Sequence, residues 1–195
     1  MRVRDASTGQ TYFRKRRKRN DNGQPRELTF SCFRGHRFLE KVCTREWFLK
    51  ALELARQRWP VDLWAWVIMP EHVHLLVSPH ESQLKLGKFQ GYIKEHTARP
   101  AIQWLEKNSP AFLHRITVQE GTVTRRRFWQ SGGGYDRNVE QERTLESMIE
   151  YIHLNPVRRG LCERPEEWEW SSARWYAGIR PVRVEIDVTL PTRYG

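Results

Sequence analysis

Two histidines in the segment Trp64 to Pro79 are the first residues whose spacing suggests chemistry. His72 and His74 are separated by Val73 in the motif PEHVH, within a stretch rich in Trp, Val and Ile. A strand sends alternate side chains to opposite faces, so both imidazoles should share one face and Val73 should point to the other. Two imidazoles about 7 Å apart along a strand can bind one metal ion.

A second pair, Tyr151 and Asn155, lies in a segment with helical periodicity. Residues 140–155 carry an apolar i, i+3, i+4, i+7 stripe, and Pro156 should end the helix. Residues four apart stack on one helix face, so Tyr151 can carry chemistry while Asn155 supports the same ion. His153 lies about 200° around the helix from the tyrosine and should point away from the site. The stripe consists of Leu145, Met148, Ile149 and Ile152.

A tyrosine needs assistance to act as a nucleophile. The ordinary pKa of a phenol is about 10, so a nearby cation or base must favour the phenolate at neutral pH. A divalent ion could do this and could also polarise a phosphate. Each residue also has an ordinary structural interpretation: hydrated surface histidines, a tyrosine at the edge of the core, and a helix-capping asparagine. Their co-occurrence in this order favours a metal-assisted tyrosine nucleophile acting on nucleic acid.

The charge balance also indicates a polyanionic partner. The sequence contains 34 Lys and Arg against 23 Asp and Glu, which gives a formal charge of +11 and a pI of about 10.0. Nucleic acid is the first candidate, although a basic soluble protein without such a partner would have the same balance. A chain of 195 residues can bury one sizeable core but is short for two domains.

The cysteines and the apolar runs exclude several classes of protein. Cys32, Cys43 and Cys162 are odd in number and form no CxxC motif, so neither a disulfide framework nor a thiolate zinc site is indicated. No apolar run approaches the roughly 20 residues of a membrane span, and the N-terminus does not resemble a signal peptide. We therefore expect a cytoplasmic protein without membrane contact.

The expected elements alternate between strands and helices. The helix at 44–58 should be capped by Thr44, and the helix at 82–107 should break or kink at Pro100, with residues 101–105 forming a separate short helix if it breaks. Between Met69 and Glu71 the chain should turn, which makes the two flanking strands a hairpin. The strands are expected at 27–33, 61–69, 72–78 and 112–118, and a strand or an extended edge is expected at 125–130.

Three regions flank or interrupt these elements. Residues 1–26 contain an unbroken basic block and are expected to form a flexible arm that either holds phosphates or has no specific role. Three glycines at 132–134 indicate a hinge or turn, because the fingerprint of a phosphate-binding loop is missing around them. We expect one domain at 27–178 and a C-terminal tail at 179–195.

The segments MPEHVHLLVSP and YIHLNPVRRGL, with RFWQ between them and WEWSSARWY after them, resemble the REP-associated tyrosine transposases. This family is part of the wider HUH group of single-tyrosine transposases and relaxases. The resemblance covers roughly residues 27–178. It implies an α+β fold in which helices pack on a central antiparallel sheet, the ferredoxin-like or RRM-like fold of HUH endonucleases, with the Tyr151 helix docked beside the sheet.

The resemblance also implies roles for individual residues. His72 and His74 would bind a divalent ion, Mg²⁺ or Mn²⁺, with Asn155 as the third ligand. Tyr151 would attack a phosphodiester of single-stranded DNA and leave a 5′-phosphotyrosine and a free 3′-hydroxyl. Two imidazoles alone would suit a softer metal such as Zn²⁺ better. Basic side chains that could hold DNA phosphates, or simply form a solvated face, are Lys94, Arg125, Arg126 and Arg127.

The expected function is therefore nicking and joining of single-stranded DNA at palindromic repeats that fold into hairpins. A tyrosyl phosphodiester conserves bond energy, so no nucleotide cofactor is expected. Both monomers and homodimers occur in the family. One alternative is a domesticated protein that binds hairpin DNA or RNA without cleaving it. The other is a metal-dependent hydrolase that uses water and leaves no protein-bound DNA.

Overall fold

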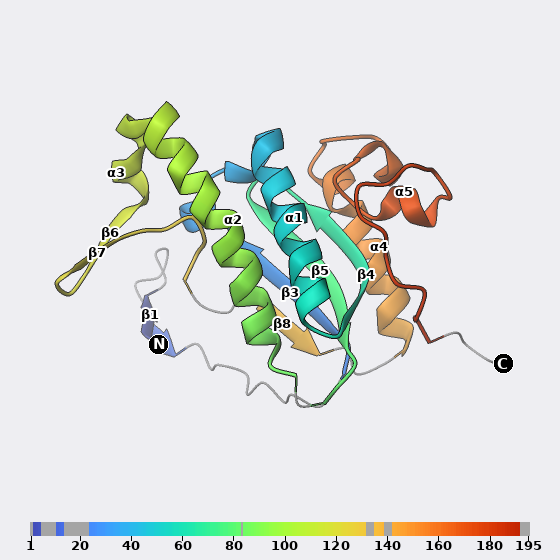
Figure 1. Cartoon of the computed structure of the whole chain (residues 1–195). Coiled ribbons are helices and arrows are strands. Elements are labelled where there is room, and N and C mark those ends of the chain that lie inside the picture. The colour runs from blue at the N-terminus through green and yellow to red at the C-terminus, as the bar shows by residue number, and fades with distance from the viewer. Residues whose placement is uncertain are drawn as a thin grey trace.

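A computed structural model describes residues 2–4, 11–13, 24–82, 84–131, 135–138 and 142–191 (Figure 1). The basic block at 14–19 and the glycines at 132–134 lie outside the described residues, so the interpretations of both stay predictions. Within the segment expected to be an arm, β1 (Arg2–Arg4) and β2 (Thr11–Phe13) pair as a two-stranded sheet.

A four-stranded antiparallel sheet forms the centre of the fold, with the strand order β4-β5-β3-β8. The predicted hairpin is confirmed, since Met69 N–H donates to the carbonyl of His72 across the turn between β4 and β5. Strand β3 lies beside β5, and this pairing places Glu27, Thr29 and Ser31 on the sheet face that carries the histidines. The strands are β3 (Arg26–Ser31), β4 (Val61–Ile68), β5 (His72–Pro79) and β8 (Tyr135–Asn138).

The sheet is covered on both faces. On one face α1 (Val42–Arg58) and α2 (Leu86–Asn108) pack over Val73 and the alternate residues of β5. On the other face the apolar stripe of α4 (Glu142–Arg158) packs against Leu76 and residues of β4. Figure 1 shows α4 behind the sheet, away from α1 and α2. The α+β fold is thus confirmed, and the tyrosine helix covers the second face of the sheet.

The segment after α4 completes the β4 edge. Ile68 N–H donates to the Trp170 carbonyl and Ser172 N–H to the Trp66 carbonyl, both at 2.8 to 2.9 Å. The short helices η4 (Pro165–Glu167) and α5 (Ala173–Tyr176) flank this connection. The aromatic segment WEWSSARWY therefore blocks further strand pairing at this edge.

A small two-stranded ribbon lies apart from the central sheet. Strands β6 (Thr117–Glu120) and β7 (Val123–Arg126) form it, and Figure 1 shows that it projects beside α2. The predicted strand at 112–118 is wrong over most of its length, because η3 (Pro110–Phe112) and α3 (Leu113–Ile116) occupy it. There the aromatic ring of Phe112 packs on Phe38 rather than in a ladder.

The helix boundaries correct three predictions. Helix α1 begins at Val42, so Thr44 lies within it and does not cap it. Helix α2 continues through Pro100, and Ala101 packs in the core beyond it, so residues 101–105 do not form a separate helix. Helix α4 continues past Pro156 to Arg158. Two further short helices are η1 (Phe33–Gly35) and η2 (Phe38–Glu40). None of the described helices is long and apolar enough to cross a membrane.

Candidate active site

Both histidines of β5 lie on the sheet face covered by α4, and a carboxylate contacts each of them. His74 Nδ1 lies 2.8 Å from Glu27 Oε1 and 3.0 Å from Thr29 Oγ1 of the neighbouring strand. His72 Nδ1 lies 3.1 Å from Glu71 Oε1. An ionised carboxylate only accepts hydrogen bonds, so each Nδ1 carries the proton. In the neutral form of each ring, the lone pair on Nε2 is then available to a metal ion.

The immediate surroundings of His72 keep its imidazole neutral. Burial, and after it the proximity of His74, lower the pKa of His72 to about 4, although Glu71 acts in the opposite direction. Burial of Glu71 opposes ionisation of its carboxyl. However, the hydrogen bond from Arg159 and the proximity of His72 outweigh that effect, so the pKa of Glu71 lies below its ordinary value. A neutral imidazole beside an ionised carboxylate is the form that binds metals.

Helix α4 brings Tyr151 to this pair of histidines. The rings of His72 and His74 are 4.9 Å apart, and the ring of Tyr151 stands 5.7 Å from His74, nearly perpendicular to it at 88°. Tyr151 is 42% exposed, so its hydroxyl remains accessible to a large substrate. The guanidinium of Arg158 lies over the Tyr151 ring at 5.0 Å. A phenol, two imidazoles and a guanidinium therefore meet at one accessible place.

Asn155 has a role in the helix whatever its role at the site. Its Nδ2 donates to the Tyr151 carbonyl at 2.8 Å and lies 3.5 Å from the Ile152 carbonyl. Pro156 has no N–H to offer that second carbonyl, so the Asn155 amide compensates in part, which explains how α4 passes through Pro156. Only the amide oxygen of Asn155 is suited to a divalent ion.

The donor set fits a divalent metal, although it is sparse. Among the described residues, no group of three or more His, Cys, Asp and Glu side chains is arranged to hold a metal ion. Two imidazoles oriented by carboxylates are nevertheless a usual metal-binding arrangement. His72, His74 and Asn155 would hold the ion, as the family resemblance implies, and this ligand set stays a prediction. Sequence reasoning missed Glu27, Glu71 and Arg158, although the position of Glu71 directly before His72 was a usable signal.

The four predicted phosphate-binding residues are brought together. Lys94, Arg125, Arg126 and Arg127 line one open groove of about 540 Å³ between α2 and the ribbon. Arg126 pairs with Glu106, and Arg125 and Arg127 pair with Glu120. At one end of the groove Gln130 N–H donates to the Ser31 carbonyl at 2.9 Å. Ser31 is the direct β-sheet partner of His72, but Lys94 lies over the ring of Phe30 on the α2 side of the sheet, whereas both histidines face α4.

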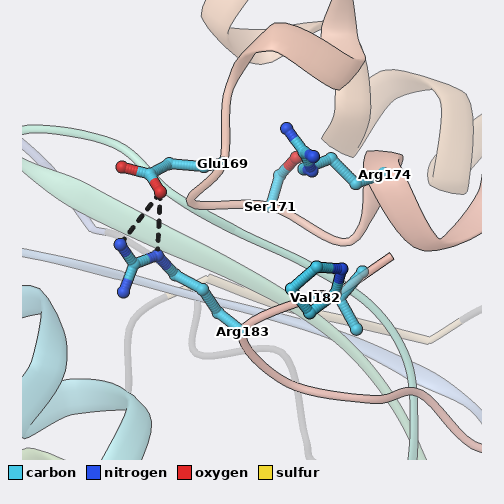
Figure 2. A pocket seen from close by; sticks show the side chains of 6 residues that line it. Glu169, Ser171, Arg174, Val182 and Arg183 are labelled. Carbon is cyan, nitrogen blue, oxygen red and sulfur yellow. Dashed lines mark hydrogen bonds and ion pairs between the residues drawn. The ribbon is translucent and has the colours of Figure 1, made fainter. Parts of the chain in front are cut away.

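A second, smaller cavity contains none of the predicted site residues. It has a volume of about 310 Å³ and lies between the segment around Ser171 and the chain at Val182. Figure 2 shows Arg183 reaching Glu169 across this cavity.

His153 points away from the site, as predicted. Its Nε2 lies 2.8 Å from Ser172 Oγ, and burial lowers the pKa of His153 to about 4. Between pH 6.5 and 4 the unfolded chain binds a proton that folded His153 does not, so the free energy of unfolding should fall as pH falls. The contribution of His153 should reach about 3 kcal/mol at pH 4.

Urea unfolding between pH 7 and 4 measures this contribution. A His153→Gln variant, whose amide can still bond Ser172, should lose stability less steeply with acid than the unaltered chain. Equal slopes for the two proteins would contradict the assignment.

The comparisons with known proteins agree with the family resemblance and with the fold. A curated relative from Haemophilus influenzae, whose name places it among the REP-associated tyrosine transposases, is 27% identical over 140 residues, which cover 71% of each chain. The REP-associated tyrosine transposase of Escherichia coli K12 is 23% identical over 143 residues, which cover 71% of this chain and 70% of the relative. This chain is a relative of the REP-associated tyrosine transposases. No protein-family model matches it.

The fold is that of a REP-associated tyrosine transposase as well. The solved structure of such a transposase bound to a REP hairpin superposes with a TM-score of 0.66 at 17% identity. The match covers 93% of this chain and 99% of that chain. At this level of identity the superposition establishes the shared fold.

Proposed function

We propose that this REP-associated tyrosine transposase relative nicks and joins single-stranded DNA at hairpin-forming palindromic repeats, in a reaction that requires Mg²⁺ or Mn²⁺. The observation that supports this proposal most is the contact of Tyr151 with His74, beside a second histidine whose Nδ1 is also held by a carboxylate. A tyrosine of the core would be buried, whereas Tyr151 is exposed at the place where the histidines converge.

The chemistry is transesterification at phosphorus. The Tyr151 oxygen loses its proton and attacks the phosphate, the bond to the 3′ oxygen breaks, and that oxygen leaves as a protonated 3′-hydroxyl. A divalent ion on His72, His74 and Asn155 would polarise the scissile phosphate and offset its developing charge. Arg158, over the Tyr151 ring, places a further positive charge beside the attacking group. Because the phosphotyrosine keeps the bond energy, a 3′-hydroxyl can reverse the step and join strands.

The groove of Lys94 and Arg125 to Arg127 is proposed to hold the DNA backbone. Gln130, which lines the groove, donates to the carbonyl of Ser31, the β-sheet partner of His72, so a strand that leaves the groove there and passes around the edge of β3 would reach the α4 face of the sheet. The arginines currently pair with Glu106 and Glu120, and exposed ion pairs of this kind contribute little. A phosphate can therefore replace either carboxylate at low cost.

Removal of two groove charges should weaken binding in a salt-dependent way. A chain with Arg126→Gln and Arg127→Gln should bind a single-stranded hairpin more weakly, with a slope of log K against log salt that is shallower by about 1.4. Fluorescence anisotropy between 50 and 300 mM salt measures both quantities. Arg164→Gln, which removes an exposed arginine paired with Glu167, is the matched control. An unchanged slope in the double variant would exclude the groove.

The direct test of the proposed function is a denaturing gel of end-labelled hairpin DNA from repeats that flank the gene. Incubation with protein and Mn²⁺ or Mg²⁺ should give a shifted, protease-sensitive species that chelator abolishes. Cleavage without that species would identify a hydrolase that uses water. Binding without cleavage on several hairpins would identify a hairpin-binding protein without catalytic activity.

A further inference from the structure

The end of the tyrosine helix and the turn of the histidine hairpin are joined by an ion pair. Arg159, directly after α4, contacts Oε1 of Glu71. The same oxygen lies 3.1 Å from His72 Nδ1. The Glu71 side chain is only 18% exposed, whereas Arg159 is 59% exposed, so the carboxylate is the sheltered member. One oxygen atom therefore contacts both the helix that carries Tyr151 and the imidazole of His72.

The turn that presents Glu71 is held firmly by the main chain. Cys32 N–H donates to the Glu71 carbonyl at 2.7 Å, and Leu39 N–H donates to the Pro70 carbonyl at 2.9 Å. The backbone of Glu71 is thus fixed by hydrogen bonds, whereas the Arg159 side chain is the more exposed partner of the pair. By contrast, the apolar stripe of α4 ends at Ile152, two turns before Arg159. Beyond Ile152, Arg159 joins the helix end to the hairpin through Glu71, and Leu161 packs against the same apolar cluster as the stripe.

We propose that Arg159 and Glu71 are positioning residues that hold the tyrosine helix in register with the histidine hairpin. The two consecutive arginines then have different roles. Arg158 lies over the Tyr151 ring, and Arg159 pairs with Glu71 in the turn of the hairpin. The inference rests on the proposed function for its catalytic consequence. The structural consequence, a helix end fixed to the hairpin, does not depend on catalysis.

The first readout is independent of activity. Hydrogen exchange of the amides at 152–158 should become about tenfold faster in Arg159→Ala and in Glu71→Ala, and the double variant should exchange no faster than Glu71→Ala alone. Arg99→Ala, which breaks an exposed Arg–Glu pair on α2, should leave these amides unchanged. Equal exchange in Arg159→Ala and the unaltered chain, or additive effects in the double variant, would overturn the proposal.

Two further measurements separate the contact of Glu71 with His72 from its contact with Arg159. Calorimetric titration with Mn²⁺ should show an affinity within threefold of normal for Arg159→Ala, and a 10- to 100-fold loss for Glu71→Ala, which removes the partner of His72. The single-turnover rate of adduct formation should fall about tenfold in Arg159→Ala and recover in part in Arg159→Lys. A normal rate in Arg159→Ala would contradict a positioning role.

A failure of the proposed function is distinguishable from a failure of this inference. If the unaltered chain forms no adduct, the proposed function fails and no rate of adduct formation can be measured. The hydrogen-exchange and Mn²⁺-affinity measurements then test the inference by themselves. If the adduct forms but the exchange pattern is unchanged in every variant, the proposed function stands and the link between Arg159 and Glu71 has no positioning role.

Discussion

Tyr151→Phe should abolish the covalent adduct with DNA and lower the nicking rate at least about a thousandfold, because the proposed function assigns the attack on phosphorus to the phenol oxygen. The substitution removes one hydroxyl from a side chain that is 42% exposed, so the free energy of unfolding should change by no more than about 0.5 kcal/mol. Hairpin binding should persist. Adduct formation and anisotropy on the same preparation measure these outcomes.

Tyr176 provides the matched control for this substitution. It is 38% exposed, and its hydroxyl donates to the Trp64 carbonyl at 2.8 Å. Tyr176→Phe should therefore lose a structural hydrogen bond and keep full nicking activity. If Tyr151→Phe still formed the adduct, the nucleophile would be another residue. If both variants lost activity together with stability, the effect would be structural.

His74→Gln should weaken the binding of Mn²⁺ at least about 100-fold and abolish metal-dependent adduct formation. The glutamine amide can still donate to Glu27, so the buried carboxylate is not left unpaired and the fold should persist. Glu27→Gln should have a smaller effect, about 10- to 100-fold, because it alters the orientation and basicity of His74 but leaves both imidazoles in place. Calorimetric titration of each variant with Mn²⁺ gives the affinities.

A histidine on the same hairpin serves as the control. His80 follows β5 directly, and its Nε2 lies 2.6 Å from Asp62 Oδ1 at an exposed position. His80→Gln should leave both Mn²⁺ affinity and adduct formation unchanged. A loss of affinity in His80→Gln equal to that in His74→Gln would place the metal outside the proposed site.

The histidine hairpin could be predicted because its signals are local. Alternation along β5 assigned Val73 to the core and His74 to the other face, and the proline turn fixed the position of the hairpin. The helix of Tyr151 followed from its apolar period in the same way. Prolines were harder to interpret, because Pro156 is tolerated where the Asn155 side chain supplies a donor in its vicinity.

The partners of the histidines could not be predicted, because they depend on strand pairing. Glu27 reaches His74 only because β3 lies beside β5 in the register that pairs Thr29 with His74. Arg159 reaches Glu71 only because α4 packs across the second face of the sheet. The periodicity of one segment predicts neither the order of the strands in the sheet nor the face that a helix covers.

The central claim is that Tyr151 forms the bond to DNA, and peptide mapping of the adduct tests it most directly. Trypsin digestion of protein that has reacted with hairpin DNA and Mn²⁺, followed by nuclease trimming and mass spectrometry, should place a nucleotide on the peptide Thr144 to Arg158, at Tyr151. A nucleotide found on Tyr176 or on another residue, or nicked DNA with every tyrosine unmodified, would contradict the account.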